Sequence, residues 1–174
     1  MATNNFARWV RNLDGATEPL TMLALFQAGA TQAISAGELL EFTGDTNTAF
    51  VPLDSDYAMD GDVAIAAEEI KSGDRAGYYS VYVPRPGDVW EFDLATAAAT
   101  PYGTVMTYSS SEVVTTGGSN TLGTAVGQEH YPDHQGHLAD DVSGDAGTTI
   151  KTIGTVRMTI DLKASFYSTF VAIM

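Results

Sequence analysis

The stretch GYYSVYV (residues 77–83) is the clearest indication of fold in this sequence. Successive side chains of an extended strand point to opposite faces of a sheet. One face would carry Tyr79, Val81 and Val83, and the other would carry Tyr78, Ser80 and Tyr82. Because both faces carry groups that pack well in sheets, the stretch predicts a central strand.

Similar segments follow one another along the chain, separated by Gly, Asp, Asn or Pro at intervals of roughly ten residues, which is typical of all-β folds. No long amphipathic helix is evident. We therefore predict an all-β protein: an extended N-terminal arm over residues 1–19, then a single compact β-barrel, β-tulip-like or sandwich domain over residues 20–174. The predicted strands are 20–27, 31–35, 38–43, 48–53, 62–67, 76–84, 88–94, 103–108, 111–116, 123–128, 150–161 and 165–173.

TVRMTIDL (155–162) alternates more regularly than any other stretch, since apolar and polar residues exchange at each step. We expect Val156, Met158, Ile160 and Leu162 to point inward. Two segments are ambiguous: DVAIAAEEI (62–70) could form a short helix, and DLATAAAT (93–100) is too rich in alanine to assign.

Three segments combine a small residue, glycine and an acidic residue immediately before a predicted strand. They are ISAGELLEF (34–42), IKSGDRAGYY (70–79) and PRPGDVWEF (84–92). Glycine tolerates the positive φ of a tight turn, and an acidic side chain keeps the turn solvated. The spacing is irregular, so we interpret them as independent turns of the same chemistry and exclude a solenoid or propeller.

The charge of the chain argues against nucleic acid as a partner. There are 22 acidic and 8 basic residues, a formal net charge of −14, whereas nucleic-acid binding needs clustered cations. No apolar run approaches the length of about 20 residues that spans a membrane, and the N-terminus does not resemble a signal peptide. Cysteine is absent, which excludes disulfides and thiolate-bound zinc.

All the histidines lie in EHYPDHQGH (129–137), which raises the question of a metal site. On a helix the spacing of His130, His134 and His137 would bring them to one side. Pro132 and Gly136 do not suit a helix interior. We therefore predict an exposed polar loop and no bound cofactor, with zinc binding as the alternative.

DSDYAMDGD (54–62) places four aspartates around Gly61 and suggests calcium. They are Asp54, Asp56, Asp60 and Asp62. Aligned as an EF-hand loop on Gly61, the stretch puts Ala58 and Ala67 at ligand positions, which rejects that motif. A solvated turn is expected, and a looser calcium site stays open. Because the sequence also lacks a nucleophile elbow, a P-loop and a dinucleotide fingerprint, we predict that the protein is not an enzyme.

NNFARWVRN (4–12) combines aromatic residues and arginines in a polar context. Such residues are enriched at interface hot spots, and two cations suit an acidic neighbour. We therefore predict Phe6, Arg8, Trp9 and Arg11 as interface residues. The alternative is that Phe6 and Trp9 pack against the protein's own core.

Several stretches together resemble the head-decoration, or capsid cement, proteins of tailed bacteriophages. They are AISAGELLEFTG (33–44), EEIKSGDRAGYYSVYVPRPGD (68–88), TLGTAVGQE (121–129) and TIGTVRMTIDL (152–162). The similarity is one of turn and strand types and includes no catalytic motif, and the loop at 129–149 is longer than the family's connection.

The resemblance implies a virion structural protein that is made in the host cytoplasm and lies on the outer capsid surface. Its expected partners are the major capsid protein and itself, as a homotrimer, with no nucleic acid and no membrane. The alternatives are a calcium- or glycan-binding, adhesin-like β-sandwich and a metal-dependent hydrolase that uses the histidine loop.

Overall fold

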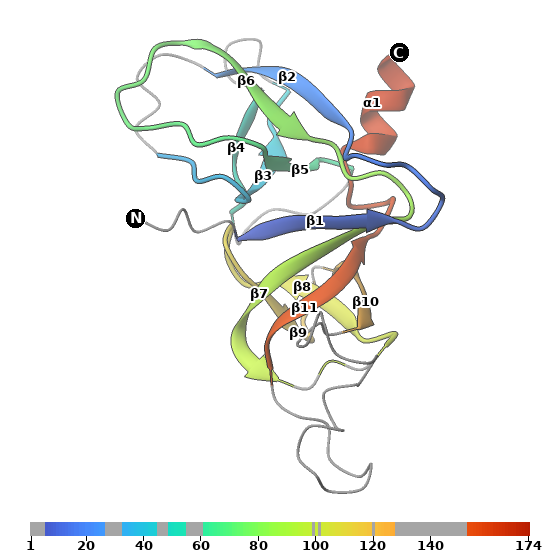
Figure 1. Ribbon diagram of the computed structural model, residues 1–174. Helices are drawn as coiled ribbons and strands as arrows, with labels where there is room; N and C mark the ends of the chain where they lie inside the picture. The colour runs from blue at the N-terminus through green and yellow to red at the C-terminus, as the bar shows by residue number, and fades with distance from the viewer. Residues whose placement is uncertain are drawn as a thin grey trace, which may run out of the picture.

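The computed structural model describes residues 6–26, 33–44, 49–54, 61–98, 100, 102–119, 121–127 and 153–174, and nearly all of its regular structure is β (Figure 1). The strands are β1 (Ala7–Asn12), β2 (Thr21–Phe26), β3 (Leu39–Phe42), β4 (Phe50–Pro52), β5 (Val63–Ala66), β6 (Gly77–Tyr82), β7 (Asp88–Ala98), β8 (Val105–Tyr108), β9 (Val114–Thr116), β10 (Thr121–Gly127) and β11 (Ile153–Ile160). The helix is α1 (Tyr167–Ile173). The all-β prediction is confirmed.

One sheet closes into a barrel. Its strand order is β1-β7-β11-β10-β8-β9, and β9 also pairs with β7 through Val114 and Leu94. This last pairing joins the ends of a five-stranded cycle, β7-β11-β10-β8-β9, while β1 pairs with another part of β7. Closure leaves few exposed edges, and the predicted β-barrel is confirmed.

The second sheet has the order β2-β6-β5-β3-β4 and lies on the other side of β1 from the barrel (Figure 1). GYYSVYV supplies β6, which pairs with β2 on one edge and β5 on the other. The prediction that it is an internal strand is therefore confirmed. At the far edge, the Ala49 N–H donates to the Leu25 C=O at 2.9 Å, which brings the start of β4 back to β2.

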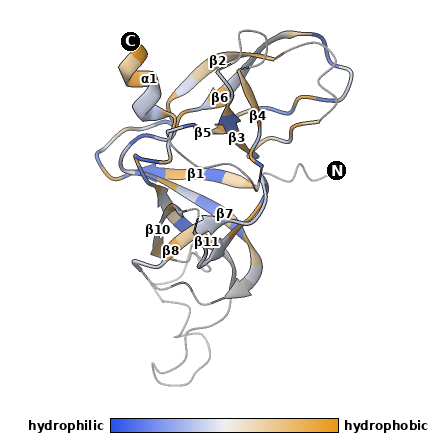
Figure 2. Ribbon diagram, turned by 180° about the vertical axis from the view of Figure 1, so that it is seen from behind, coloured by the Kyte–Doolittle hydropathy of each residue, from blue (hydrophilic) through white to orange (hydrophobic). Residues whose placement is uncertain are grey.

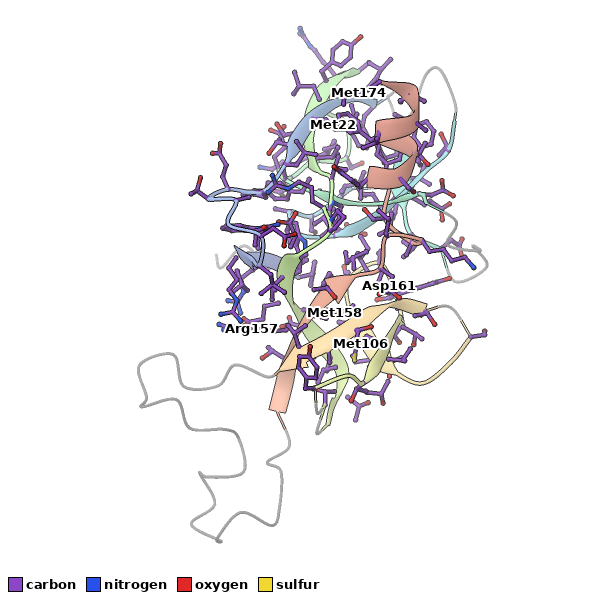
Figure 3. All side chains as sticks on the ribbon, turned by 90° about the vertical axis from the view of Figure 1, so that its right-hand side faces the viewer. Met22, Met106, Arg157, Met158, Asp161 and Met174 are labelled. Carbon is purple, nitrogen blue, oxygen red and sulfur yellow. The ribbon has the colours of Figure 1, made fainter. Side chains whose placement is uncertain are left out.

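Two apolar cores share strands β3 and β5. Leu39 packs in the barrel cluster, whereas its neighbour Leu40 packs in a second cluster above it. Val63 and Ile65 of β5 likewise join the barrel cluster, and Ala64 joins the other. In Figure 3, Met106 and Met158 mark the barrel half, and Met22 and Met174 lie at the opposite end with α1.

The three turns noticed in the sequence have the same geometry. In each, the fourth residue's N–H donates to the first residue's C=O, at 3.1 Å in Ser35–Glu38, 2.9 Å in Lys71–Asp74 and 3.1 Å in Arg85–Asp88. The acidic side chain accepts from the first residue's N–H, at 2.8, 2.7 and 2.9 Å respectively. The glycines Gly37, Gly73 and Gly87 have φ of 86°, 90° and 81°, a region that favours glycine.

The structure corrects the prediction of an N-terminal arm over residues 1–19. Ala7–Asn12 is strand β1 and pairs antiparallel with β7, so this part of the predicted arm belongs to the main sheet. Figure 2 shows hydrophilic and hydrophobic residues mixed along β1, whose register with β7 shifts between Trp9 and Arg11.

The predicted strand at 165–173 is also wrong, because α1 forms there. Leu162, predicted to point inward, is 50% exposed, since β11 ends at Ile160 and a turn follows. Segment 31–35 contributes only an isolated bridge at Ile34 among its described residues. The two ambiguous segments each contain strand: DVAIAAEEI forms β5 over Val63–Ala66, and DLATAAAT forms the end of β7 up to Ala98.

Candidate binding groove beside strand β1

A pocket of about 310 Å³ lies between β1 and the second sheet. We call it the β1 groove. It is lined by Ala7, Arg8, Trp9, Pro19, Ala36, Gly37, Ala66, Ala67 and Tyr82. Arg8 and two aromatic residues, Trp9 and Tyr82, have the large side chains among these residues. Small residues from the turn at Ser35–Glu38 and from the end of β5 make up most of the rest.

The backbone of β1 approaches the turn at Gly37 very closely. A Cβ placed on Gly37 would lie 2.7 Å from the backbone nitrogens of Phe6 and Ala7. Any side chain here would push β1 away from the second sheet, so the glycine is needed both for its positive φ and for this contact. The turn thus sets the spacing between the two sheets at this side of the groove.

Trp9 is held in place by a buried carboxylate. Its indole Nε1–H donates to Asp88 Oδ1 at 3.1 Å, and Asn12 Nδ2 donates to the same oxygen at 2.8 Å. Asp88 is fully buried and forms an ion pair with Arg85, whose Nε lies 3.3 Å from Oδ2. Arg85 in turn donates to the Glu18 C=O at 2.5 Å. This network ties β1 and the segment that follows it to the turn before β7.

The opposite wall is also fixed. Tyr82 packs against the barrel cluster, and its ring centroid lies 5.4 Å from that of the fully buried Trp90. Aromatic side chains that are packed on one side lose little further freedom when a ligand binds. The groove is therefore preformed.

Arg8 connects the groove to the outer face of the barrel sheet. In the β1-β7-β11 register, Arg8, Glu91 and Arg157 form one cross-strand row. Arg8 forms an ion pair with Glu91 Oε1, and Arg157 Nε lies 3.2 Å from Glu91 Oε2. Figure 3 shows Arg157 on the outer side of β11, away from Met158 in the core.

The structure brings two of the predicted interface residues, Arg8 and Trp9, into this groove. Phe6 is half-buried and Arg11 is exposed. Sequence reasoning missed Tyr82 and the carboxylates Asp88 and Glu91 that hold Trp9 and Arg8. No local signal could have identified them, because they come from distant strands.

The alternative interpretation of Trp9 is supported in part, since it is half-buried and packs against the barrel cluster. Trp9 is also one of the residues that line the groove. Trp9 therefore contributes to the core and to the pocket together.

The proposed calcium loop is described only at its ends, Asp54 and Asp62, while Asp56 and Asp60 lie outside the described residues. Burial raises the pKa of Glu41 on β3, and the negative charges of Asp54 and Asp62 raise it further. A hydrogen bond from the Asp54 backbone N–H acts in the opposite direction and lowers the pKa. Burial also raises the pKa of Asp62. Within the described ranges, no group of three His, Cys, Asp or Glu side chains is arranged to hold a metal ion.

His130, His134 and His137 lie outside the described residues, so their prediction is unchanged. In the part of the chain that the structure describes, no helix is long and apolar enough to cross a membrane. Comparison with protein-family models, with curated proteins and with solved structures found no match for this chain.

Proposed function

We propose that this is an interaction protein that attaches to another protein through the β1 groove. The observation that carries the proposal is that Arg8 and Trp9 line one preformed pocket with Tyr82. Tryptophan, tyrosine and arginine are the residues most enriched at binding hot spots. The volume of about 310 Å³ lies at the lower end of the range of about 300–1,000 Å³ that is usual for pockets that hold small molecules.

We propose, more specifically, that it is a capsid decoration subunit of a tailed bacteriophage, which binds the major capsid protein on the outer shell surface and assembles with copies of itself. The resemblance of its turns and strands to cement proteins supports this role, as does a net charge of −14, which disfavours contact with packaged DNA. Ligand binding to one lattice state stabilises that state by mass action, and repetition over many sites multiplies the effect.

The first test is quantitative mass spectrometry of purified particles from the source lysate. We expect this chain in an amount of about one copy per shell subunit, as for one symmetric contact. Background amounts would sink the decoration role, and zinc and glycan binding of the purified protein would then be measured instead.

The second test places the attachment at the groove. Ala67→Leu adds bulk to the groove wall without removing the Trp9–Asp88 bond. We expect it to lower occupancy on particles about tenfold or more. Tyr102→Ala is the control, because Tyr102 is 81% exposed and is not a lining residue. Equal occupancy of the two variants, with both folded by circular dichroism, would exclude the groove.

A further inference from the structure

We propose that the β1 groove takes one apolar side chain of an extended partner segment, and that Arg8 binds a carboxylate placed next to that side chain. This deepens the attachment role and rests on it, because it names the chemistry of the surface that the protein binds. The ligand class is therefore an apolar residue followed or preceded by Asp or Glu.

The apolar half of the proposal follows from the lining. Trp9 and Tyr82 provide two aromatic surfaces, and Pro19, Ala36 and Ala66 provide small apolar ones. No carboxylate is among the lining side chains. An apolar side chain that enters would exchange water for these surfaces, which is favourable in proportion to the area buried.

Tyr82 adds a phenolic hydroxyl to the residues that line the groove. Tyr82 lines the groove, and no described residue is hydrogen-bonded to its hydroxyl. A phenolic hydroxyl both donates and accepts. It can therefore bind a backbone group of the entering segment.

The carboxylate half follows from Arg8. Its side chain is 57% exposed, and Nη2 donates to Glu91. A guanidinium has five N–H donors in a planar fork, so the bond to Glu91 fixes the side chain while donors remain for a ligand. Glu91 also contacts Arg157, so this one carboxylate lies between two cations.

Charge complementarity decides between an acidic and a basic partner segment. Arg11 is exposed three residues further along β1, and no described residue forms an ion pair with it. Two exposed arginines thus stand on β1, although the chain as a whole carries −14. The charges at the contact itself set the orientation and the choice of partner. The arginines of β1 therefore favour a partner segment with a carboxylate, although the overall negative charge of the chain would favour a positively charged partner.

The test uses the purified full chain labelled with ¹⁵N and three short, blocked, glycine- and serine-rich peptides. Their central residues are Leu-Glu, Leu-Lys or Gly-Glu. Binding is followed by NMR at the Trp9 indole N–H and the Arg8 Nε–H. We expect the Leu-Glu peptide to bind at least about tenfold more tightly than either of the others. Tighter binding of the Leu-Lys peptide, or no shift of the Trp9 indole signal with the Leu-Glu peptide, would overturn the proposal.

Two variants separate the halves of the site. Arg8→Gln should remove the preference for glutamate over lysine and keep the dependence on leucine, whereas Ala67→Leu should abolish binding of both leucine peptides. Arg75→Gln is the control with the same change of charge, because Arg75 precedes β6 and Tyr82 lies at that strand's other end. If Arg75→Gln loses the preference for the glutamate peptide to the same extent, the preference depends only on the net charge of the protein, and a specific role of Arg8 is refuted.

The peptide experiment contains no particles, so it fails independently of the decoration role. Loss of peptide selectivity with normal particle occupancy would refute the Arg8 site and leave attachment in place. If the protein is absent from particles but still distinguishes the peptides, the decoration role is refuted, and the groove remains a site for an acidic segment of another partner.

Discussion

Gly123 on β10 lies so close to β11 that no side chain fits there. A Cβ would overlap the Thr159 carbonyl oxygen and would lie 2.8 Å from Met158 Cε. Because the obstacle is backbone, Gly123→Ala should lower the free energy of unfolding by at least about 2 kcal/mol. Chemical denaturation measures this. Gly77→Ala is the control, since its Cβ would have ordinary contact at 3.6 Å from Tyr79, and a cost as large there would contradict the explanation.

Asp88 is the residue on which the groove wall depends. It accepts from Trp9, Asn12 and Arg85 and is fully buried. Asp88→Asn would leave the Arg85 guanidinium without its carboxylate partner. It would also replace one accepting oxygen by an NH₂ group, which would face the N–H groups that now donate to Asp88. We expect a loss of about 2–4 kcal/mol and a changed Trp9 indole N–H shift in NMR spectra. Asp93→Asn, at an exposed site on the same strand, should change stability by less than about 0.5 kcal/mol.

Residue burial was predictable where one pattern continued through a whole strand. Val156, Met158 and Ile160 are buried as expected from their alternation. The alternation continues through Leu162, but Ala164 and Ser165 both donate to the Asp161 C=O and turn the chain there. A turn defined by backbone bonds leaves the hydrophobic pattern unchanged, so the pattern extended the strand too far.

The C-terminal element shows how composition misled the strand prediction. FYSTFVAI is rich in aromatic and β-branched residues, which favour strands. Phe166 and Phe170 nevertheless stand four apart on one side of the chain, and Ser165 Oγ accepts from the Tyr167 N–H at 3.1 Å. The serine and the spacing of four were the available signals for a helix.

Phe166 anchors this end of the chain in the second core. Its ring centroid lies 4.8 Å from that of Phe42 and 5.1 Å from that of Phe50, and it is 1% exposed. Phe166→Ala should cost about 3–5 kcal/mol in unfolding free energy, measured by thermal and chemical denaturation. Val171→Ala on the exposed side of α1 should cost less than about 1 kcal/mol. Similar costs would mean that α1 does not dock through Phe166.

The part of the second sheet where β3 pairs with the start of β5 should respond to pH. Burial, followed by the charges of Asp54 and Asp62, raises the pKa of Glu41 above 4.5. A carboxyl group whose pKa is higher in the folded state binds its proton more tightly there than in the unfolded state. Its ionised form therefore destabilises the fold above the folded-state pKa, and protonation removes that destabilisation as the pH falls. Glu41→Gln should therefore equal or exceed the wild type in stability at neutral pH, by less than about 1 kcal/mol because the group is partly solvated.

The difference between Glu41→Gln and the wild type should vanish as the pH is lowered toward 4.5, the ordinary value. Urea denaturation at a series of pH values provides the measurement. Glu112→Gln, at an exposed position, serves as the control for removing one negative charge. A Glu41→Gln variant that is less stable than the wild type at neutral pH would contradict the prediction that ionised Glu41 destabilises the fold.

At the scale of the whole molecule, the all-β class followed from turn spacing and strand composition, but the groove could not. It requires β1, β5, β6 and the turn at Ser35–Glu38 to meet, and their sequence positions carry no information about that meeting. Arg8 and Trp9, predicted to lie in an extended arm, belong instead to β1, and both line the groove. The prediction of an interface there rests on the chemistry of aromatic and arginine side chains and stays a prediction. The pairing of β1 with β7 could not be predicted, because it depends on a strand some eighty residues away.

The two cores should unfold together, because β3 and β5 contribute alternate side chains to both. Leu39 and Leu40 are adjacent yet belong to different clusters, so neither cluster can lose its strands without exposing the other. The two tryptophans, Trp9 and Trp90, report on the barrel core, and the methyl NMR signals of Val81 and Val83 report on the second core. We expect both probes to give the same thermal midpoint.

The sharper form of this prediction uses one cavity in each core. Leu40→Ala in the second cluster and Leu122→Ala in the barrel should each cost about 2–5 kcal/mol and should each lower the midpoints of both probes equally, since a cooperative unit loses stability as a whole. If Leu40→Ala lowers only the valine midpoint and leaves tryptophan fluorescence unchanged, the second sheet unfolds independently. The spacing across the β1 groove would then not be fixed by the barrel, and the groove could open without loss of the barrel fold.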